Sequence, residues 1–146
     1  MLFRSELSHI FPSSSERPAD IFVPNFSLGK GLVFDVAVTC PLQHKYLHDA
    51  SQIARFACNN YADQEKRKKF QERVANEGFI YLPAVIESFG GLSLDLPDFF
   101  FKLTKALSLR FNEPKSITSK YFFEKLSCTL MNQMLDQFHH LQGFLN

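Results

Sequence analysis

The order of apolar and polar positions predicts two short strands near the start of the chain. Residues 19–23 and 32–39 are rich in β-branched and aromatic side chains, which favour strands. Pro24 is expected to end the first strand, because proline cannot donate to a ladder of backbone hydrogen bonds. The segment 27–31 contains two glycines, a composition typical of a turn. We therefore expect the two strands to form a hairpin.

Helical spacing replaces strand spacing from about residue 42. Apolar side chains then recur at intervals of three, four and seven, as they do along one face of a helix. Asn59 and Asn60 are expected to break or bend this helix, because asparagine is a poor helix former. A second helical stretch covers about residues 62–76, and Gly78 follows at the position where glycine commonly ends a helix.

A third strand and two further helices complete the expected elements. The continuous apolar run 79–86 indicates a strand buried on both faces, although Pro83 favours an edge or a bulge. A helix over about 96–109 has Asp95 as its candidate N-cap, and a helix over about 116–141 keeps an apolar period near 3.6. The order β-β-α-β-α-α predicts an α/β fold, with a small mixed sheet of the hairpin and a central strand, flanked by helices.

Composition fits one folded domain and singles out no class of partner. The 146 residues are 45% hydrophobic and 21% charged, which supports a core and excludes a disordered chain. Sixteen Lys and Arg against 15 Asp and Glu give a formal net charge of +1, so a nucleic-acid surface would have to come from local clustering. No apolar run reaches the ~20 residues that span a membrane, and the N-terminus lacks the apolar centre of a signal peptide.

Cysteine and histidine positions do not predict a zinc site. Cys40, Cys58 and Cys128 are odd in number and widely spaced, which excludes a cysteine zinc knuckle and predicts free, mostly buried thiols in a reducing compartment. We therefore expect an intracellular protein, nuclear if its host is a eukaryote. His44 and His48 lie four residues apart, but the Glu of an HEXXH motif is absent, so a helix surface is the favoured interpretation.

Acidic residues within apolar strands are the main chemical signal. Asp35 has three apolar residues on each side, and a buried ionised carboxylate is costly unless a positive group meets it. Asp20 at the start of the preceding strand and Glu87 at the end of the third strand pose the same question. Carboxylates at such positions suggest a site for a hard cation such as Mg²⁺, which can hold a phosphate and activate water in phosphodiester hydrolysis.

The register of the hairpin decides whether Asp20 and Asp35 meet. They lie opposite each other if the turn centres between Ser27 and Leu28, and about three residues out of register if it centres on Gly29. The sequence leaves both registers open. The structural alternatives are a turn or cap for Asp20, an ion pair with Arg17 or Arg55 for Asp35, and a strand end or helix contact for Glu87.

The densest cluster of charge lies in the second helical stretch. Lys66, Lys69 and Arg73 recur at spacings of three and seven, which predicts a shared helix face. Together with Lys68 they are candidates for nucleic-acid binding, since such side chains contact phosphates independently of base sequence. Lys66 or Lys69 could instead orient the attacking water or stabilise transition-state charge. The structural alternative is a solvated helix face.

These residues together resemble the PD-(D/E)XK, or restriction-endonuclease-like, nucleases. The segments Arg17–Ile21 and Phe34–Val38 are similar to the two acidic motifs of the variant found downstream of reverse transcriptase in non-LTR retrotransposon proteins. The Lys-x-x-Lys-aromatic stretch Lys66–Phe70, and a strand ending in Glu87 before a Gly-Gly pair, are also similar. The likeness covers about residues 17–92.

The resemblance implies a DNA-nicking endonuclease that uses Mg²⁺ or Mn²⁺ and whose longer parent protein carries a reverse transcriptase. Asp20 and Asp35 would then be catalytic and metal-binding, and Glu87 would be a third ligand or would position water. The family's lysine two residues after the second acid is missing, because that position is Ala37, so Lys66 or Lys69 would replace it.

The family core has the order α-β-β-β-α-β, whereas only two strands are evident here before the first long helix. Ser8–Phe11 is a weak remnant of the missing strand, and Glu6 a remnant of an upstream acid. We therefore expect a truncated nuclease, with residues 1–16 as an upstream remnant or linker, 17–92 as the nuclease-like core and 93–146 as a C-terminal helical extension. The alternative is a catalytically inactive nucleic-acid-binding or interaction fragment of the same fold.

Overall fold

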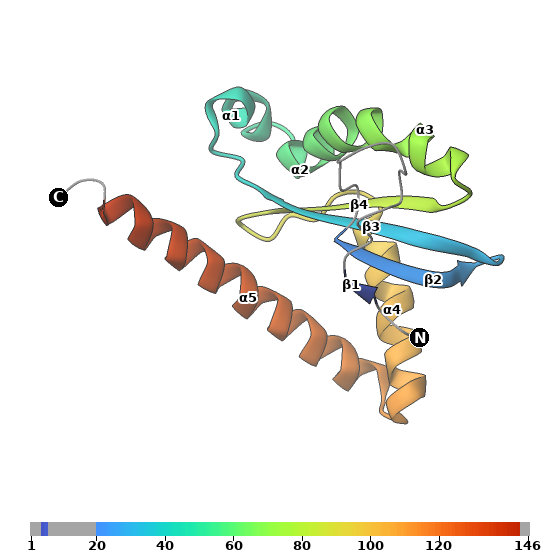
Figure 1. Ribbon diagram of the computed structural model, residues 1–146. Helices are drawn as coiled ribbons and strands as arrows, with labels where there is room; N and C mark the ends of the chain where they lie inside the picture. Colours follow the sequence, from blue (N-terminus) through green and yellow to red (C-terminus); the bar gives the residue numbers. More distant parts are fainter. Residues whose placement is uncertain (1–3, 6–19, 144–146) are drawn as a thin grey trace.

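A computed structural model describes residues 4–5 and 20–143, which form a mixed sheet with helices on both faces (Figure 1). The strand order is β1-β2-β3-β4. Pairing is antiparallel between β1 and β2 and between β2 and β3, and parallel between β3 and β4. The strands are β1 (Arg4–Ser5), β2 (Ile21–Ser27), β3 (Lys30–Thr39) and β4 (Ile80–Glu87). The α/β class and the mixed sheet predicted from the sequence are therefore confirmed.

The hairpin between β2 and β3 contains a bulge that changes its register. Its two turn residues, Leu28 and Gly29, both have positive φ, at 50° and 77°, which matches the twist of a two-residue hairpin turn. Ser27 pairs with Lys30, but Val23 pairs with Leu32, so residues 24–26 oppose a single residue of β3. The expectation that Pro24 ends the strand is wrong, because Pro24 lies in the bulge, where the regular ladder is interrupted.

The helical region on one face of the sheet is interrupted at a different position from the one expected. They are α1 (His44–Ala50), α2 (Phe56–Asn60), the π-helical segment η1 (Tyr61–Arg67) and α3 (Lys68–Asn76). The interruption lies at residues 51–55, where Arg55 adopts a left-handed φ of 62°. The helix continues through Asn59 and Asn60 into η1, and the side-chain oxygen of Asn59 accepts from the N–H of Leu94 at 2.9 Å.

The π-helical segment keeps one row of side chains against the sheet. In an α-helix of 3.6 residues per turn, each four-residue step over-rotates by about 40°, which amounts to about 160° after four steps. The wider turns of η1 offset this drift, and the row at four-residue spacing stays buried or half-buried. This row consists of Cys58, Ala62, Lys66, Phe70 and Val74.

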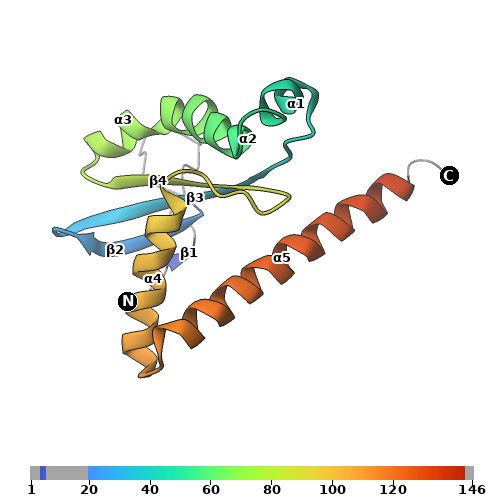
Figure 2. The ribbon, with the colours of Figure 1, turned by 180° about the vertical axis from the view of Figure 1, so that it is seen from behind.

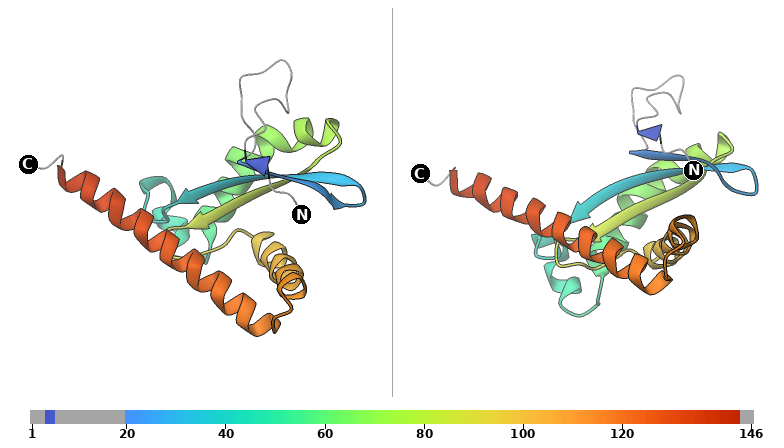
Figure 3. Two further views of the ribbon diagram at one scale, coloured as in Figure 1. Left: turned by 60° about the horizontal axis from the view of Figure 1, so that its bottom comes forward. Right: turned by 90° about the horizontal axis from the view of Figure 1, so that it is seen from below.

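The opposite face is covered by α4 (Leu96–Phe111), and α5 (Lys115–Gly143) extends beside it (Figures 2 and 3). The prediction that Asp95 caps α4 through its side chain is wrong, because that side chain makes no capping hydrogen bond. The Asp95 carboxylate pairs with Arg67 instead. No helix in the described part of the chain is both long and apolar enough to cross a membrane. The larger core cluster lies on this face and contains Val23, Leu32, Phe34, Ala84, Ile86, Leu96 and Phe100.

β4 lies at the edge of the sheet and not at its centre, which corrects the expected position of the third strand. It is nevertheless covered on both faces, in agreement with its apolar sequence. The N–H of Val85 points away from β3, to the hydroxyl oxygen of Ser93 at 3.3 Å. Pro83, two residues earlier, faces the same way, so its missing N–H costs no bond to β3.

Candidate carboxylate–lysine site

Asp35 lies in the middle of β3 with its side chain on the face covered by η1 and α3. It is only 6% exposed. The Lys66 ammonium lies 2.9 Å from its Oδ2 and 3.2 Å from its Oδ1, and the Tyr81 hydroxyl donates to Oδ2 at 2.9 Å. The buried charge of Asp35 is therefore met by one cation and one neutral donor.

Asp20 precedes β2 and binds β3 on both sides of Asp35. Its N–H donates to the carbonyl of Phe34 at 3.0 Å, and its Oδ2 accepts from the N–H of Val36 at 2.7 Å. The bulge in β2 produces this arrangement, since Ile21 pairs with Phe34 and the next residue therefore stands beside Asp35. Of the two registers left open by the sequence, the structure adopts the one that brings the two aspartates together.

The charges in this region act on one another. Burial raises the pKa of Asp35 above its usual value, and the negative charge of Asp20 adds to this, whereas Lys66 and Tyr81 lower it. Burial and the Asp35 charge raise the pKa of Tyr81 far above the range of an ordinary phenol. Tyr81 therefore stays protonated and acts as a permanent hydrogen-bond donor.

Lys66 reaches Asp35 from the π-helical segment. Its side chain is 19% exposed, so this ion pair is much drier than a surface salt bridge. Arg55 does not form the alternative ion pair with Asp35. It is exposed at the start of α2 and does not contact Asp35. Arg17 lies outside the described residues. The sequence identified Lys66 as one of two candidate lysines but not its target.

Glu87 does not join the two aspartates. It pairs with Thr39, four residues beyond Asp35 along the parallel ladder, roughly 13 Å away at the strand rise. Its Oε1 instead accepts from the N–H of Cys58 at 3.2 Å, where the N–H groups at the start of a helix lack intrahelical partners. Glu87 thus contacts a helix, which is one of the structural alternatives named for it above. This contact fixes the helix that carries Lys66.

The remaining basic candidates do not reach the carboxylates. Lys68, Lys69 and Arg73 are exposed, and the Lys69 ammonium lies 4.8 Å from the centre of the Phe70 ring. The expectation that Lys66 shares a face with Lys69 and Arg73 is wrong, because Lys66 points to the sheet. Lys66 lies instead in the row with the buried Phe70 and Val74, whereas Lys69 and Arg73 are exposed.

Tyr81 is a site residue that the sequence pattern does not single out, because its only signal is a hydroxyl in an otherwise apolar strand. The structure places its ring in the cluster with Val33, Phe70 and Val74. Among the residues that the structure describes, no three His, Cys, Asp or Glu side chains gather into a metal-binding group. His44 and His48 are exposed on α1. The expectation of buried thiols holds for Cys58, while Cys40 is half-buried and Cys128 is exposed.

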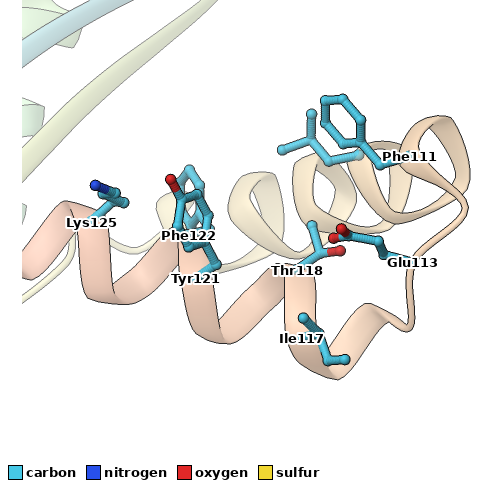
Figure 4. A pocket seen from close by; sticks show the side chains of 8 residues that line it. Phe111, Glu113, Ile117, Thr118, Tyr121, Phe122 and Lys125 are labelled. Carbon is cyan, nitrogen blue, oxygen red and sulfur yellow. The ribbon is translucent and has the colours of Figure 1, made fainter.

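A pocket of about 470 Å³ lies between the end of α4 and the start of α5, in a different part of the fold (Figure 4). Its walls are mainly apolar, and it contains none of the candidate catalytic residues. It is lined by Leu107, Phe111, Glu113, Ile117, Thr118, Tyr121, Phe122 and Lys125.

No protein-family model, curated protein or solved structure matches this chain. The geometry around Asp35 is therefore the basis for a functional proposal.

Proposed function

We propose that this chain is a metal-dependent DNA endonuclease domain of the restriction-endonuclease-like class, which nicks DNA as part of a retroelement-type protein. The observation that carries the proposal is the Lys66 ammonium, 2.9 Å from the carboxylate of Asp35, with Asp20 on the neighbouring strand. Two acids on adjacent strands and one basic side chain are the groups that the nuclease motif requires. Here the basic group comes from a helix and not from position 37.

The element order supports the same proposal. The nuclease core has the order α-β-β-β-α-β, and the sequence shows only two strands before the helix. β1 adds a third strand, which pairs antiparallel with β2, so the described part has the order β-β-β-α-β through β4. The expected remnants of the upstream strand and acid, Ser8–Phe11 and Glu6, lie outside the described residues.

The donor atoms of the two aspartates suit Mg²⁺ or Mn²⁺. These ions take oxygen ligands and commonly bind through one or two carboxylates together with water and substrate phosphates. Asp20 is exposed, and only its Oδ2 has a hydrogen-bond partner in the described part of the chain, so its Oδ1 remains open. When bound, such an ion supplies charge to hold a phosphate and to lower the pKa of attacking water.

The protein's own residues then have separate roles. Asp20 and Asp35 would hold the ion, and Lys66 is placed to orient water or to stabilise negative charge that develops on the phosphate. Ala37 takes the place of the usual lysine and packs against the cluster of Cys58, Ala62 and Val85. The exposed Lys68, Lys69 and Arg73 provide phosphate contacts that do not depend on base sequence.

Plasmid nicking tests this proposal. The full chain is incubated with supercoiled DNA and Mg²⁺ or EDTA, beside Asp20→Asn, Asp35→Asn and the control Asp49→Asn, which changes an exposed acid on α1. We expect nicking that requires Mg²⁺, disappears in the first two variants and persists in the control. Absence of nicking by a wild-type chain that circular dichroism shows to be folded would refute the proposal.

The second candidate is a catalytically inactive nucleic-acid-binding fragment. It is favoured by the fact that the described residues gather two acids and not three. In that case DNA binding measured by fluorescence anisotropy in EDTA would be strong, would weaken steeply with salt, and would be unchanged in Asp35→Asn. The nicking assay and the binding assay together separate the two functions.

A further inference from the structure

We propose that Tyr81 is a positioning residue that determines which oxygen of Asp35 faces the metal ion. The proposal rests on the endonuclease function proposed above and extends it to a residue outside the motif. Each carboxylate oxygen can accept about two hydrogen bonds.

The two oxygens of Asp35 are occupied unequally. Oδ2 accepts from the Tyr81 hydroxyl at 2.9 Å and also lies 2.9 Å from the Lys66 ammonium, so two donor groups face it. Oδ1 accepts from Lys66 at 3.2 Å and has no second hydrogen-bond partner among the residues that the structure describes, which leaves one acceptor site. A metal ion could therefore bind Oδ1 without displacing either neighbour of Oδ2. The carboxylate is prepared to bind through one oxygen.

Tyr81 is held more firmly than Lys66. Its strand is paired with β3 along eight residues, in which Tyr81 stands beside Val33. Its ring also packs near that of Phe70, with ring centres 6.1 Å apart. A tyrosine on a paired strand has two rotatable side-chain bonds, whereas the lysine ammonium sits at the end of four flexible carbons. The fixed donor is therefore the one that orients the carboxylate.

Loss of the Tyr81 hydroxyl should change the kind of ion that binds as well as the affinity. With Oδ2 partly released, the carboxylate can bind through both oxygens. Ca²⁺ accepts such two-oxygen ligation and irregular geometry, whereas Mg²⁺ requires near-octahedral geometry, and Mn²⁺ also favours octahedral oxygen sites. A general loosening of the fold would weaken both ions alike, so the ratio of the two affinities is specific for positioning.

The test measures Mn²⁺ and Ca²⁺ binding to the metal-free full chain by isothermal titration calorimetry. The variants are Tyr81→Phe, which keeps the ring, the matched control Tyr121→Phe on the exposed face of α5, and Asp35→Asn. For Tyr81→Phe we expect Mn²⁺ affinity to fall by about 10- to 100-fold, as is usual when a partner of a metal ligand is removed. We expect Ca²⁺ affinity to fall less, and Tyr121→Phe to match wild type.

The outcomes separate the two proposals. Wild-type binding that is lost in Asp35→Asn but unchanged in Tyr81→Phe would overturn the role of Tyr81 and leave the endonuclease proposal intact. Equal losses of Mn²⁺ and Ca²⁺ affinity in Tyr81→Phe would also overturn it, because they indicate a structural effect. A folded wild-type chain that binds neither ion would refute both proposals.

Discussion

Replacing Lys66 with methionine isolates the cost of the buried charge on Asp35. Methionine keeps much of the length and apolar stem of lysine but removes the ammonium. Among the residues that the structure describes, Asp35 in the variant would retain only the Tyr81 side-chain hydrogen bond and would still face the negative charge of Asp20. The variant therefore leaves an incompletely compensated carboxylate in a site that is 6% exposed.

The expected loss follows from the geometry of the ion pair. At the 2.9 Å separation of Nζ and Oδ2, Coulomb's law with an effective dielectric constant of ~20 gives an attraction of about 6 kcal/mol. Desolvation of the two charges offsets part of it, and breaking a buried pair from one side typically costs about 3–5 kcal/mol. Because Lys66 keeps some contact with solvent, we expect about 3 kcal/mol at pH 8.

Protonation of Asp35 sets a limit on this loss. The folded variant can take up a proton on Asp35 and so avoid the buried charge. Relative to the unfolded chain, in which this Asp is ionised, protonation costs about 5.6 kcal/mol at pH 8 but only about 1.5 kcal/mol at pH 5. An acid whose pKa is higher in the folded state than in the unfolded state favours folding at low pH. The deficit of the variant should therefore shrink as the pH falls through the folded-state pKa.

Urea unfolding at pH 8 and pH 5 measures this deficit. The exposed Lys68→Met serves as the matched control, with an expected change within about 0.5 kcal/mol. The double variant Asp35→Asn/Lys66→Met should lose less than Lys66→Met at pH 8, because no charge is left without a partner. A deficit of the same size at both pH values would refute the electrostatic reasoning and indicate lost packing instead.

Two further predictions concern the region around Glu87. A Cβ at Gly91 would clash with Glu87 Oε2, so Gly91→Ala should displace the carboxylate from the Cys58 N–H and cost about 1–3 kcal/mol in urea unfolding. This loss should largely vanish in a Glu87→Ala background, and additive losses would contradict the contact. Burial, with the nearby Glu87 charge, raises the pKa of the Cys58 thiol to about 12, so a thiol reagent at pH 8 should modify exposed Cys128 rapidly and Cys58 only after unfolding. Equal rates, measured with Cys58→Ala as the control, would contradict this.

Local patterns in the sequence predicted the secondary structure better than the register. The strands β2, β3 and β4, the Gly78 helix end and the two C-terminal helices follow from short-range preferences, whereas β1 was not predicted. The register of β2 and β3 does not, because it depends on a bulge in which Asn25 adopts a positive φ of 52°. With a regular ladder, a turn at the glycines would leave Asp20 and Asp35 out of register. The bulge shifts the register of β2 and places the two aspartates beside each other.

The candidate site was only partly predictable for a related reason. Burial of an acid within an apolar strand is a strong local signal, and it identified Asp35. The identity of its partners depends on which residues of other elements lie above it in space. Lys66 comes from a helix with non-standard turns, and Tyr81 from a strand 46 residues later in the chain. Neither contact leaves a periodic signal that could be read along the chain.

Because Lys66 lies in the π-helical segment, the position of its ammonium depends on how far the chain has turned about the helix axis at that residue. Removing Arg67, with a return to ordinary α-helical turns, would reduce the spacing between Lys66 and Phe70 from four residues to three and rotate Lys66 by about 100° relative to Phe70. Phe70 on one side and Cys58 on the other are anchored in the core, so Lys66 would turn between them. A single-codon deletion could thus separate the cation from Asp35 while changing none of the residues that form the pair.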